Sequence, residues 1–130
     1  MTARRRPADP ARIAAYRRGL SAETLAVWLL RAKLYRILAR RYRTPAGEID
    51  VIARRGRTIV FVEVKNRPDE TQALEAVSAT ARRRIARAAD LWLAAHPAAA
   101  GFDLRFDLII VVPGRAPRHI AGVFDADGRM

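Results

Sequence analysis

Residues 47–65 read GEIDVIARRGRTIVFVEVK, and this stretch predicts the centre of the fold. Apolar residues dominate two runs, at 49–53 and 58–65, and a basic turn around Gly56 separates the runs. Two apolar runs joined by a glycine-containing turn are typical of an antiparallel β-hairpin. In a hairpin that turns there, the numbers of facing residues sum to roughly 111–113.

Three charged residues, Asp50, Glu63 and Lys65, interrupt these otherwise apolar strands. Because side chains alternate along a strand, Glu63 and Lys65 share one face. The expected register brings Asp50 opposite or diagonal to Glu63, within a few ångströms of it. Two carboxylates this close repel each other, and a divalent cation between them relieves the repulsion.

Carboxylate oxygens suit Mg²⁺ or Mn²⁺, and Mg²⁺ keeps several waters and completes its shell with substrate phosphate. Lys65, on the same face as Glu63, would orient the attacking water or offset charge on the pentavalent phosphate. The pattern therefore predicts hydrolysis of a phosphodiester, with Asp50 and Glu63 as metal ligands. The structural alternative is a solvated strand face on which Glu63 and Lys65 form a weak ion pair.

Around the hairpin, periodicity and turn residues predict an α/β fold with a mixed β-sheet flanked by helices. The expected elements are a short helix at 9–18, a helix capped by Ser21, a strand at 35–44, a long helix from 68–71 to 96, and strands at 106–112 and 119–124. The long helix fits a right-handed crossover between two parallel strands. Apolar stripes place Trp28 and Trp92 in the core.

The length of 130 residues suits one domain, and the absence of cysteine excludes disulfide scaffolds, thiol catalysis and Cys-based zinc sites. No apolar run approaches the roughly 20 residues that span a bilayer, and the N-terminus lacks the apolar core of a secretory signal. We therefore expect a cytoplasmic protein without membrane contact. Residues 1–18 are expected to be a basic, partly disordered segment and residues 126–130 a short tail.

Positive charge is concentrated near the N-terminus. The formal net charge is +12, and residues 1–45 contribute +10 of it through 12 cations and two acids. A polyanion would meet this part first, and nucleic acid is the commonest polyanion in a cytoplasm. An Arg-rich surface that reflects a GC-rich coding sequence is the alternative.

Four segments together resemble the YraN-like family: residues 47–53, residues 60–65, Arg105-Phe106-Asp107 and His119-Ile120. These small bacterial proteins are described as predicted endonucleases of the PD-(D/E)xK, restriction-endonuclease-like fold, related to archaeal Holliday junction resolvases. The resemblance implies an αβββαβ core within a nuclease-like domain at residues 19–125. It also implies that Asp50, Glu63 and Lys65 are catalytic.

The related nucleases carry a helix glutamate that falls on Glu23, which would ligate the metal directly or through water. The alternative for Glu23 is an interaction with the N-terminal dipole of its helix. Glu48 would reach the edge of the site or fix a turn, Asp107 would be a ligand or a structural residue, and His119 is expected to be structural. The family usually has a glycine near Leu34, where this chain departs from the pattern.

The expected substrate is DNA, with branched or otherwise structured DNA as the expected form. Sequence-specific cleavage is not expected, because no segment resembles a base-reading motif. Symmetric cleavage of a junction would need a homodimer, although the sequence reveals no interface. The alternatives are a non-catalytic nucleic-acid-binding module with a relic nuclease site and a basic adaptor for an acidic protein. The residues expected to contact DNA phosphates are Arg40, Arg41, Arg43, Arg82, Arg83, Arg84 and Arg87.

Overall fold

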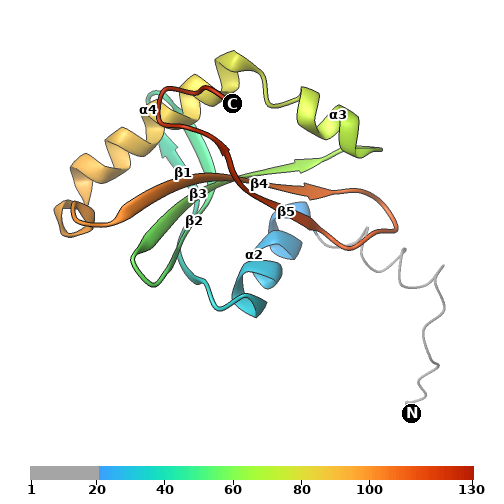
Figure 1. The fold of residues 1–130 in the computed structure, drawn as a ribbon, viewed down its shortest axis with the longest axis horizontal. Coiled ribbons are helices and arrows are strands. Elements are labelled where there is room, and N and C mark those ends of the chain that lie inside the picture. Colours follow the sequence, from blue (N-terminus) through green and yellow to red (C-terminus); the bar gives the residue numbers. More distant parts are fainter. Residues whose placement is uncertain (1–20) are drawn as a thin grey trace, which may run out of the picture.

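The computed structural model describes residues 21–130, which form one β-sheet with helices on both of its faces (Figure 1). The basic segment at 1–18 and the short helix expected at 9–18 lie outside the described residues. Within residues 21–130, no helix is long and apolar enough to cross a membrane. The elements are α2 (Ala22–Ala32), β1 (Arg36–Thr44), β2 (Gly47–Arg55), β3 (Thr58–Asn66), α3 (Glu70–Glu75), α4 (Ala79–Ala95), the 3₁₀ turn η1 (Pro97–Ala99), β4 (Asp103–Val111) and β5 (Arg118–Phe124).

The sheet has five strands in the order β1-β2-β3-β4-β5. Strands β3 and β4 are parallel, and the other three neighbouring pairs are antiparallel. The connection between β3 and β4 carries α3 and α4, as expected because parallel neighbours need a long crossover. The α/β class with a mixed sheet is thus confirmed. The hairpin register pairs Val51 with Val62, within the range expected from the sequence.

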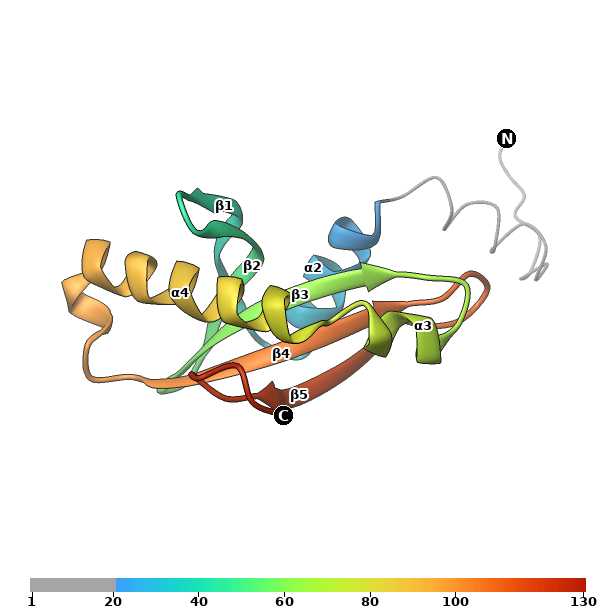
Figure 2. The same cartoon turned by 90° about the horizontal axis from the view of Figure 1, so that it is seen from above.

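Strand alternation divides the core into two layers, one on each face of the sheet. Figures 1 and 2 show α4 on one face and α2 on the opposite face. Beneath α4 lie large side chains such as Phe61 and Phe106, whereas beneath α2 lie smaller ones such as Val60 and Val62. Consecutive residues of β3 therefore enter opposite layers, which is the period-2 pattern of a strand covered on both sides.

The long helix expected between the third and fourth strands is interrupted, and this part of the prediction was wrong. Helix α3 ends at Glu75, and α4 begins after Ser78, whose hydroxyl accepts a hydrogen bond of 3.1 Å from the Ala81 N–H. Val77, in the gap, is buried. Serine competes well as an N-cap, so a new helix start at Ser78 lets the chain turn while Val77 stays in the core.

Trp28 is another correction to the sequence analysis. Its side chain lies on the outer face of α2 and is 52% exposed, whereas Trp92 on α4 is only 4% exposed. The buried residues of α2 are Ala26, Val27 and Leu30. Helical spacing identifies an apolar stripe, but it does not say how wide a stripe the sheet covers.

Helix α2 ends in a Schellman motif, which requires a left-handed residue. The Tyr35 N–H donates to the Leu30 carbonyl and the Leu34 N–H to the Arg31 carbonyl, both at 2.9 Å. Leu34 occupies the left-handed position with φ of +71° and is 82% exposed. Glycine adopts this conformation without the steric cost that a Cβ introduces.

We therefore expect Leu34→Gly to stabilise the protein. Glycine removes the left-handed strain, and an exposed leucine contributes little burial, so the gain should be on the order of 0.5–1 kcal/mol. Urea unfolding followed by circular dichroism measures it. Leu34→Ala is the matched control, because alanine removes the same side chain but keeps the Cβ and its strain. Equal stabilities of the two variants would contradict the prediction.

Candidate active site

The sequence-predicted pair Glu63 and Lys65 lies on the α4 face of β3, at the edge of a cavity of about 220 Å³. This cavity lies between the hairpin and the first turns of α4. Gly47 begins β2 close to α4, because a Cβ at this position would lie 3.6 Å from the Cβ of Arg84. The cavity is lined by Gly47, Glu48, Glu63, Lys65, Ala81, Arg84 and Ile85.

Glu63 and Lys65 form a largely buried ion pair. The Lys65 Nζ lies 3.0 Å from the Glu63 Oε2, and the side chains are 17% and 14% exposed, respectively. Burial, reinforced by the charge of Asp50, raises the pKa of Glu63 to about 7, although Lys65 acts in the opposite direction. A carboxylate with this pKa is only partly compensated by its lysine.

Asp50 lies beside Glu63, as the hairpin register predicts. The regular β2–β3 pairing ends at Val51 and Val62, and the Asp50 Oδ2 then accepts a hydrogen bond of 2.8 Å from the Val64 N–H. The carboxylate thus takes the place of a backbone acceptor at the point where the two strands separate. This contact fixes the orientation of Asp50 next to Glu63.

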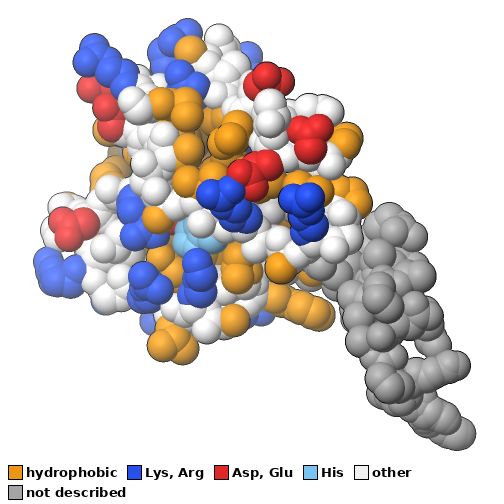
Figure 3. All heavy atoms as spheres, turned by 45° about the vertical axis from the view of Figure 1, so that its right-hand side comes forward, with side chains coloured by type: hydrophobic (Ala, Val, Ile, Leu, Met, Phe, Trp, Pro, Cys, Tyr) orange, Lys and Arg blue, Asp and Glu red, His pale blue; other side chains and the backbone are white. Residues whose placement is uncertain are grey.

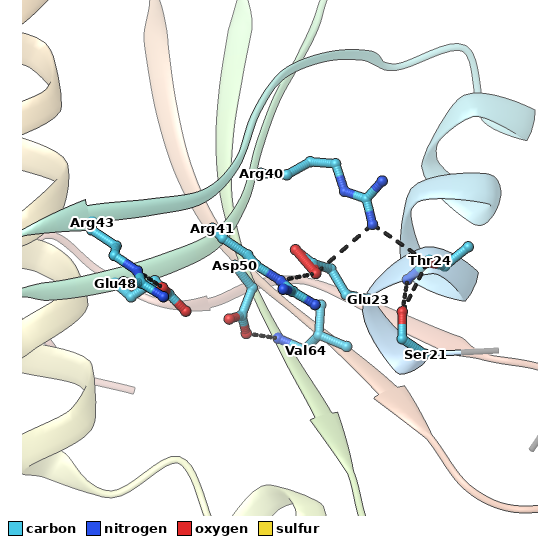
Figure 4. Close-up of polar contacts among 9 residues, drawn as sticks. All are labelled: Ser21, Glu23, Thr24, Arg40, Arg41, Arg43, Glu48, Asp50 and Val64. Atoms are coloured by element: carbon cyan, nitrogen blue, oxygen red, sulfur yellow. Dashed lines mark hydrogen bonds and ion pairs between the residues drawn. The ribbon is translucent and has the colours of Figure 1, made fainter. Parts of the chain in front are cut away.

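Glu23 reaches the neighbourhood from α2 and contacts arginines of β1 (Figure 4). Its Oε1 accepts a hydrogen bond of 2.7 Å from the Arg41 Nε and lies 3.8 Å from the Arg40 Nη2. The other oxygen, Oε2, is buried and has no hydrogen-bond partner among residues 21–130. Contacts with Glu23, and more weakly the charges of Glu48 and Asp50, raise the pKa of Arg41. Arg41 is therefore an internal counter-charge for these acids.

The donor set fits a hard cation held mainly by water and substrate. Among residues 21–130, no three His, Cys, Asp or Glu side chains gather as a metal-binding group. Asp50 and Glu63 offer two adjacent carboxyls, and Mg²⁺ is commonly held by one or two carboxylates together with substrate phosphates. Asp50 and Glu63 are thus the residues that could hold such an ion. The metal role of Glu23 stays a prediction, with its unpaired oxygen as the relevant feature.

The predicted phosphate-contacting arginines of α4 lie in different surroundings. Arg84 lines the cavity beside Glu63 and Lys65. Arg82 donates to the Gly128 carbonyl at 2.6 Å and to the Val77 carbonyl at 2.7 Å, so it ties the C-terminal residues to α4. Arg83 and Arg87 line a separate hollow. Of these four, Arg84 is the one beside the candidate site.

The arginines of β1 are more exposed than the acids they contact. The Arg43 Nε donates to the Glu48 Oε2 at 3.0 Å, and the Arg43 side chain is 85% exposed. The adjoining turn is held instead by Thr44, whose hydroxyl accepts from the N–H of Gly47 and donates to its carbonyl. Glu48 therefore lies at the edge of the site. The Arg40 and Arg41 side chains remain 44% and 66% exposed.

A second polar cluster, on the α2 face, surrounds Asp107, which is fully buried. Arg105 donates to both of its carboxylate oxygens, at 2.8 and 2.7 Å, and the His119 Nε2 lies 2.7 Å from it. Burial by itself raises the pKa of Asp107, but the hydrogen bonds from Arg105 and His119 outweigh it and hold the pKa at about 2. The structure thus favours the structural alternative for Asp107 and His119.

The sequence analysis did not anticipate this cluster, although one signal was present. Arg105 and Asp107 are two residues apart on β4 and so share a face, with the same sequence separation as Glu63 and Lys65 on β3. The Arg105 Nη2 also donates to the Tyr35 hydroxyl at 2.6 Å. The Lys33 Nζ lies 3.0 Å from the His119 Nδ1, so this nitrogen accepts and the Nε2–H donates to Asp107.

The raised pKa of Glu63 predicts a pH dependence of stability in the metal-free protein. The folded state holds the Glu63 proton more tightly than the unfolded state, so the free energy of unfolding should fall as pH rises from about 4.5 to about 7. Glu63→Gln should flatten this fall. Urea unfolding in EDTA measures the difference, with exposed Glu75→Gln as the control. Parallel profiles of the wild type and Glu63→Gln would contradict the assignment.

Asp107→Ala should destabilise the fold strongly, because it leaves the Arg105 charge without its partner. Breaking a buried ion pair typically costs roughly 3–5 kcal/mol, and the part exposure of Arg105 places the loss toward the lower end. Urea unfolding at pH 7 measures it against Asp103→Ala, which changes an exposed carboxylate on the same strand. If Asp107→Ala lowers the free energy of unfolding no more than Asp103→Ala does, the Asp107 network has no stabilising role.

Comparisons with known sequences match one family over most of the chain. The sequence model of a family described as "Uncharacterised protein family UPF0102" matches residues 22–111. A UPF0102 protein of Bradyrhizobium diazoefficiens is 54% identical over 119 residues, which cover 92% of this chain and 90% of that protein. A UPF0102 protein of Rhodopseudomonas palustris (strain HaA2) is 49% identical over 126 residues, which cover 97% and 98% of the two chains.

A third relative, a UPF0102 protein of Methylorubrum extorquens, is 53% identical over 126 residues, which cover 95% of this chain and 98% of that protein. The matched family segment runs from the start of α2 to the end of β4 and so includes Asp50, Glu63 and Lys65. These matches agree with the YraN-like resemblance of the motifs. The chain belongs to the uncharacterised protein family UPF0102, the YraN-like family.

Proposed function

We propose that this protein is a Mg²⁺- or Mn²⁺-dependent endonuclease that hydrolyses phosphodiester bonds in DNA. One observation carries the proposal: Glu63 and Lys65 line a cavity with the Lys65 ammonium 3.0 Å from Glu63, and Asp50 lies beside Glu63. A structural ion pair does not need the second carboxyl, and the second carboxyl raises the cost of burying the first. Burial of a carboxyl group whose charge is only partly balanced is more typical of functional sites than of structural ion pairs.

Asp50 and Glu63 would hold the cation. When bound, Mg²⁺ neutralises charge on the phosphate and increases the acidity of a water molecule. The Val64 N–H holds Asp50 in place, so this ligand is oriented before a cation arrives. Glu63, with its pKa near 7, needs only a modest electrostatic gain to lose its proton at neutral pH.

Lys65 supplies the positive charge at the reacting phosphate. Its side chain lies on the same strand face as Glu63 and is 17% exposed, so the ammonium is partly shielded from water. At this position it would orient the attacking water or offset charge on the pentavalent phosphorus. Arg84, across the cavity, would hold a neighbouring backbone phosphate.

Charge supports a nucleic-acid substrate. The chain carries a net charge of +12, and α2 and β1 together hold five arginines and one acid, Glu23. Each phosphate contact on duplex DNA should make the logarithm of the binding constant fall more steeply with the logarithm of the salt concentration, by a slope of roughly 0.9. We propose branched or otherwise structured DNA as the preferred substrate, since contacts to backbone phosphates recognise shape without reading sequence.

Cleavage assays on junction, flap, single-stranded and plasmid DNA with Mg²⁺ or Mn²⁺ test the proposal. The informative variants are Asp50→Asn, which keeps an acceptor for the Val64 N–H, and Lys65→Ala. We expect each to lower the cleavage rate by on the order of 10²–10³-fold while DNA affinity in EDTA stays within a few-fold. Glu75→Gln, an exposed carboxylate change on α3, is the matched control and should cut normally.

Mn²⁺ binding followed by isothermal titration calorimetry gives a readout that is independent of turnover. Wild type and Glu75→Gln should bind the ion, and Asp50→Asn should bind it at least tenfold more weakly. Equal cutting by all variants, or none by any of them while all bind DNA alike, would refute the enzyme and leave a non-catalytic nucleic-acid-binding module. Absence of DNA binding would instead favour the basic adaptor.

A further inference from the structure

Trp28 is an exposed aromatic side chain on the outer face of α2. Half of its surface is in water, although the opposite face of α2 is packed against the sheet by Ala26, Val27 and Leu30. Its indole ring offers a large flat surface, and an exposed tryptophan is suited to stacking on a flat ligand.

Arginines lie on both sides of Trp28 along the helix surface. One turn before it, the Thr24 hydroxyl accepts a hydrogen bond of 3.4 Å from Arg40 on β1. Three residues after it, Arg31 is exposed on the neighbouring part of the same face. Residues three or four positions apart are neighbours on a helix surface, so Trp28 neighbours both Thr24, which Arg40 contacts, and Arg31.

This surface carries no uncompensated negative charge from α2 or β1. The one acid of the two elements, Glu23, has a side chain only 11% exposed, and its carboxylate contacts both Arg41 and Arg40. On the face that Figure 3 draws, basic and hydrophobic side chains are interspersed, and acidic side chains lie among them. An aromatic ring near arginines suits a ligand that combines flat faces with negative charge.

Unpaired nucleotides have this combination of properties. A base can stack on tryptophan while its phosphate lies against an arginine, whereas the base faces of a duplex are covered by their neighbours. Trp28 follows Glu23 by five residues, which is about 7.5 Å along the helix axis and about 140° around it. The ring therefore points to the outer side of α2, where a strand that leaves the candidate site past this helix would meet it.

We propose that Trp28, with Arg31 and Arg40, is a stacking platform for the unpaired bases of a nucleic acid bound at the candidate site. The inference deepens the proposed function by specifying the substrate class, a strand with unpaired bases, such as a flap or the opened arm of a junction. It depends on the proposed function only for the choice of nucleic acid as the ligand. The binding itself needs no metal and no cleavage.

Intrinsic fluorescence tests the platform directly, because the chain has only two tryptophans and they differ sharply in exposure. Trp92 is buried against the His96 ring at 4.3 Å. In EDTA, a short oligothymidine should quench the wild-type emission, and the same strand annealed to its complement should quench it far less. Trp28→Phe leaves Trp92 as the only tryptophan, so the tryptophan emission, excited selectively, should not respond to either ligand.

Affinities measured by anisotropy of a labelled oligothymidine complete the test. Trp28→Ala should weaken single-strand binding roughly 5- to 100-fold and change duplex binding less than twofold. Trp28→Phe should retain most of the affinity, because it keeps an aromatic face. Arg31→Gln should lower the salt slope on single strands by about 0.7. Leu91→Ala, an exposed apolar change on α4, is the matched control and should bind normally.

Two results would overturn the inference. One is an oligothymidine that binds without changing the Trp28 emission, and the other is an equal loss of single-strand and duplex binding in Trp28→Ala. If either result is found while plasmid DNA is cleaved, the stacking platform is refuted and the proposed endonuclease stands. If single strands quench Trp28 but no DNA is cleaved, the platform stands and the endonuclease is refuted.

Discussion

The hydrogen bond from the Val64 N–H to the Asp50 carboxylate is the contact on which the candidate site depends. It forms where the β2–β3 ladder ends, so a side chain continues the pairing that the backbone has stopped. Because side-chain direction reverses with each residue, a slip of one position would turn Glu63 and Lys65 into the apolar layer beneath α2. The register therefore fixes the core and the charged site together.

The protein buries acidic side chains on two of its strands and compensates them to different degrees. Asp107 receives two hydrogen bonds from Arg105, one from His119 and one from the Gly122 N–H, and its pKa is about 2. Glu63 has a single lysine and a second carboxyl beside it, and its pKa is about 7. The network around Asp107 stabilises the folded chain. The negative charge of Asp50 and Glu63 is only partly balanced by Lys65, so an additional cation would bind there favourably.

The same contrast explains why only some of the arginines are available to a ligand. Arg105 and Arg82 are held by acceptors inside the domain, and their donors are occupied by the fold. Arg84 lines the cavity, Arg31 is exposed on α2, and Arg40 contacts Thr24 of the same helix. Composition shows that the chain is rich in arginine, but the partner of each guanidinium depends on how distant segments pack.

The hairpin, the parallel crossover and the proximity of Asp50 to Glu63 could be predicted from the sequence, since these features follow from local turns and strand alternation. The helix break at Ser78, the exposure of Trp28 and the network around Asp107 depend on how distant segments pack. Each depends on which surface covers a residue: Val77 is drawn into the core, the sheet reaches one side of α2, and β5 brings His119 to Asp107. Periodicity gives the face of an element, and only packing decides what lies against that face.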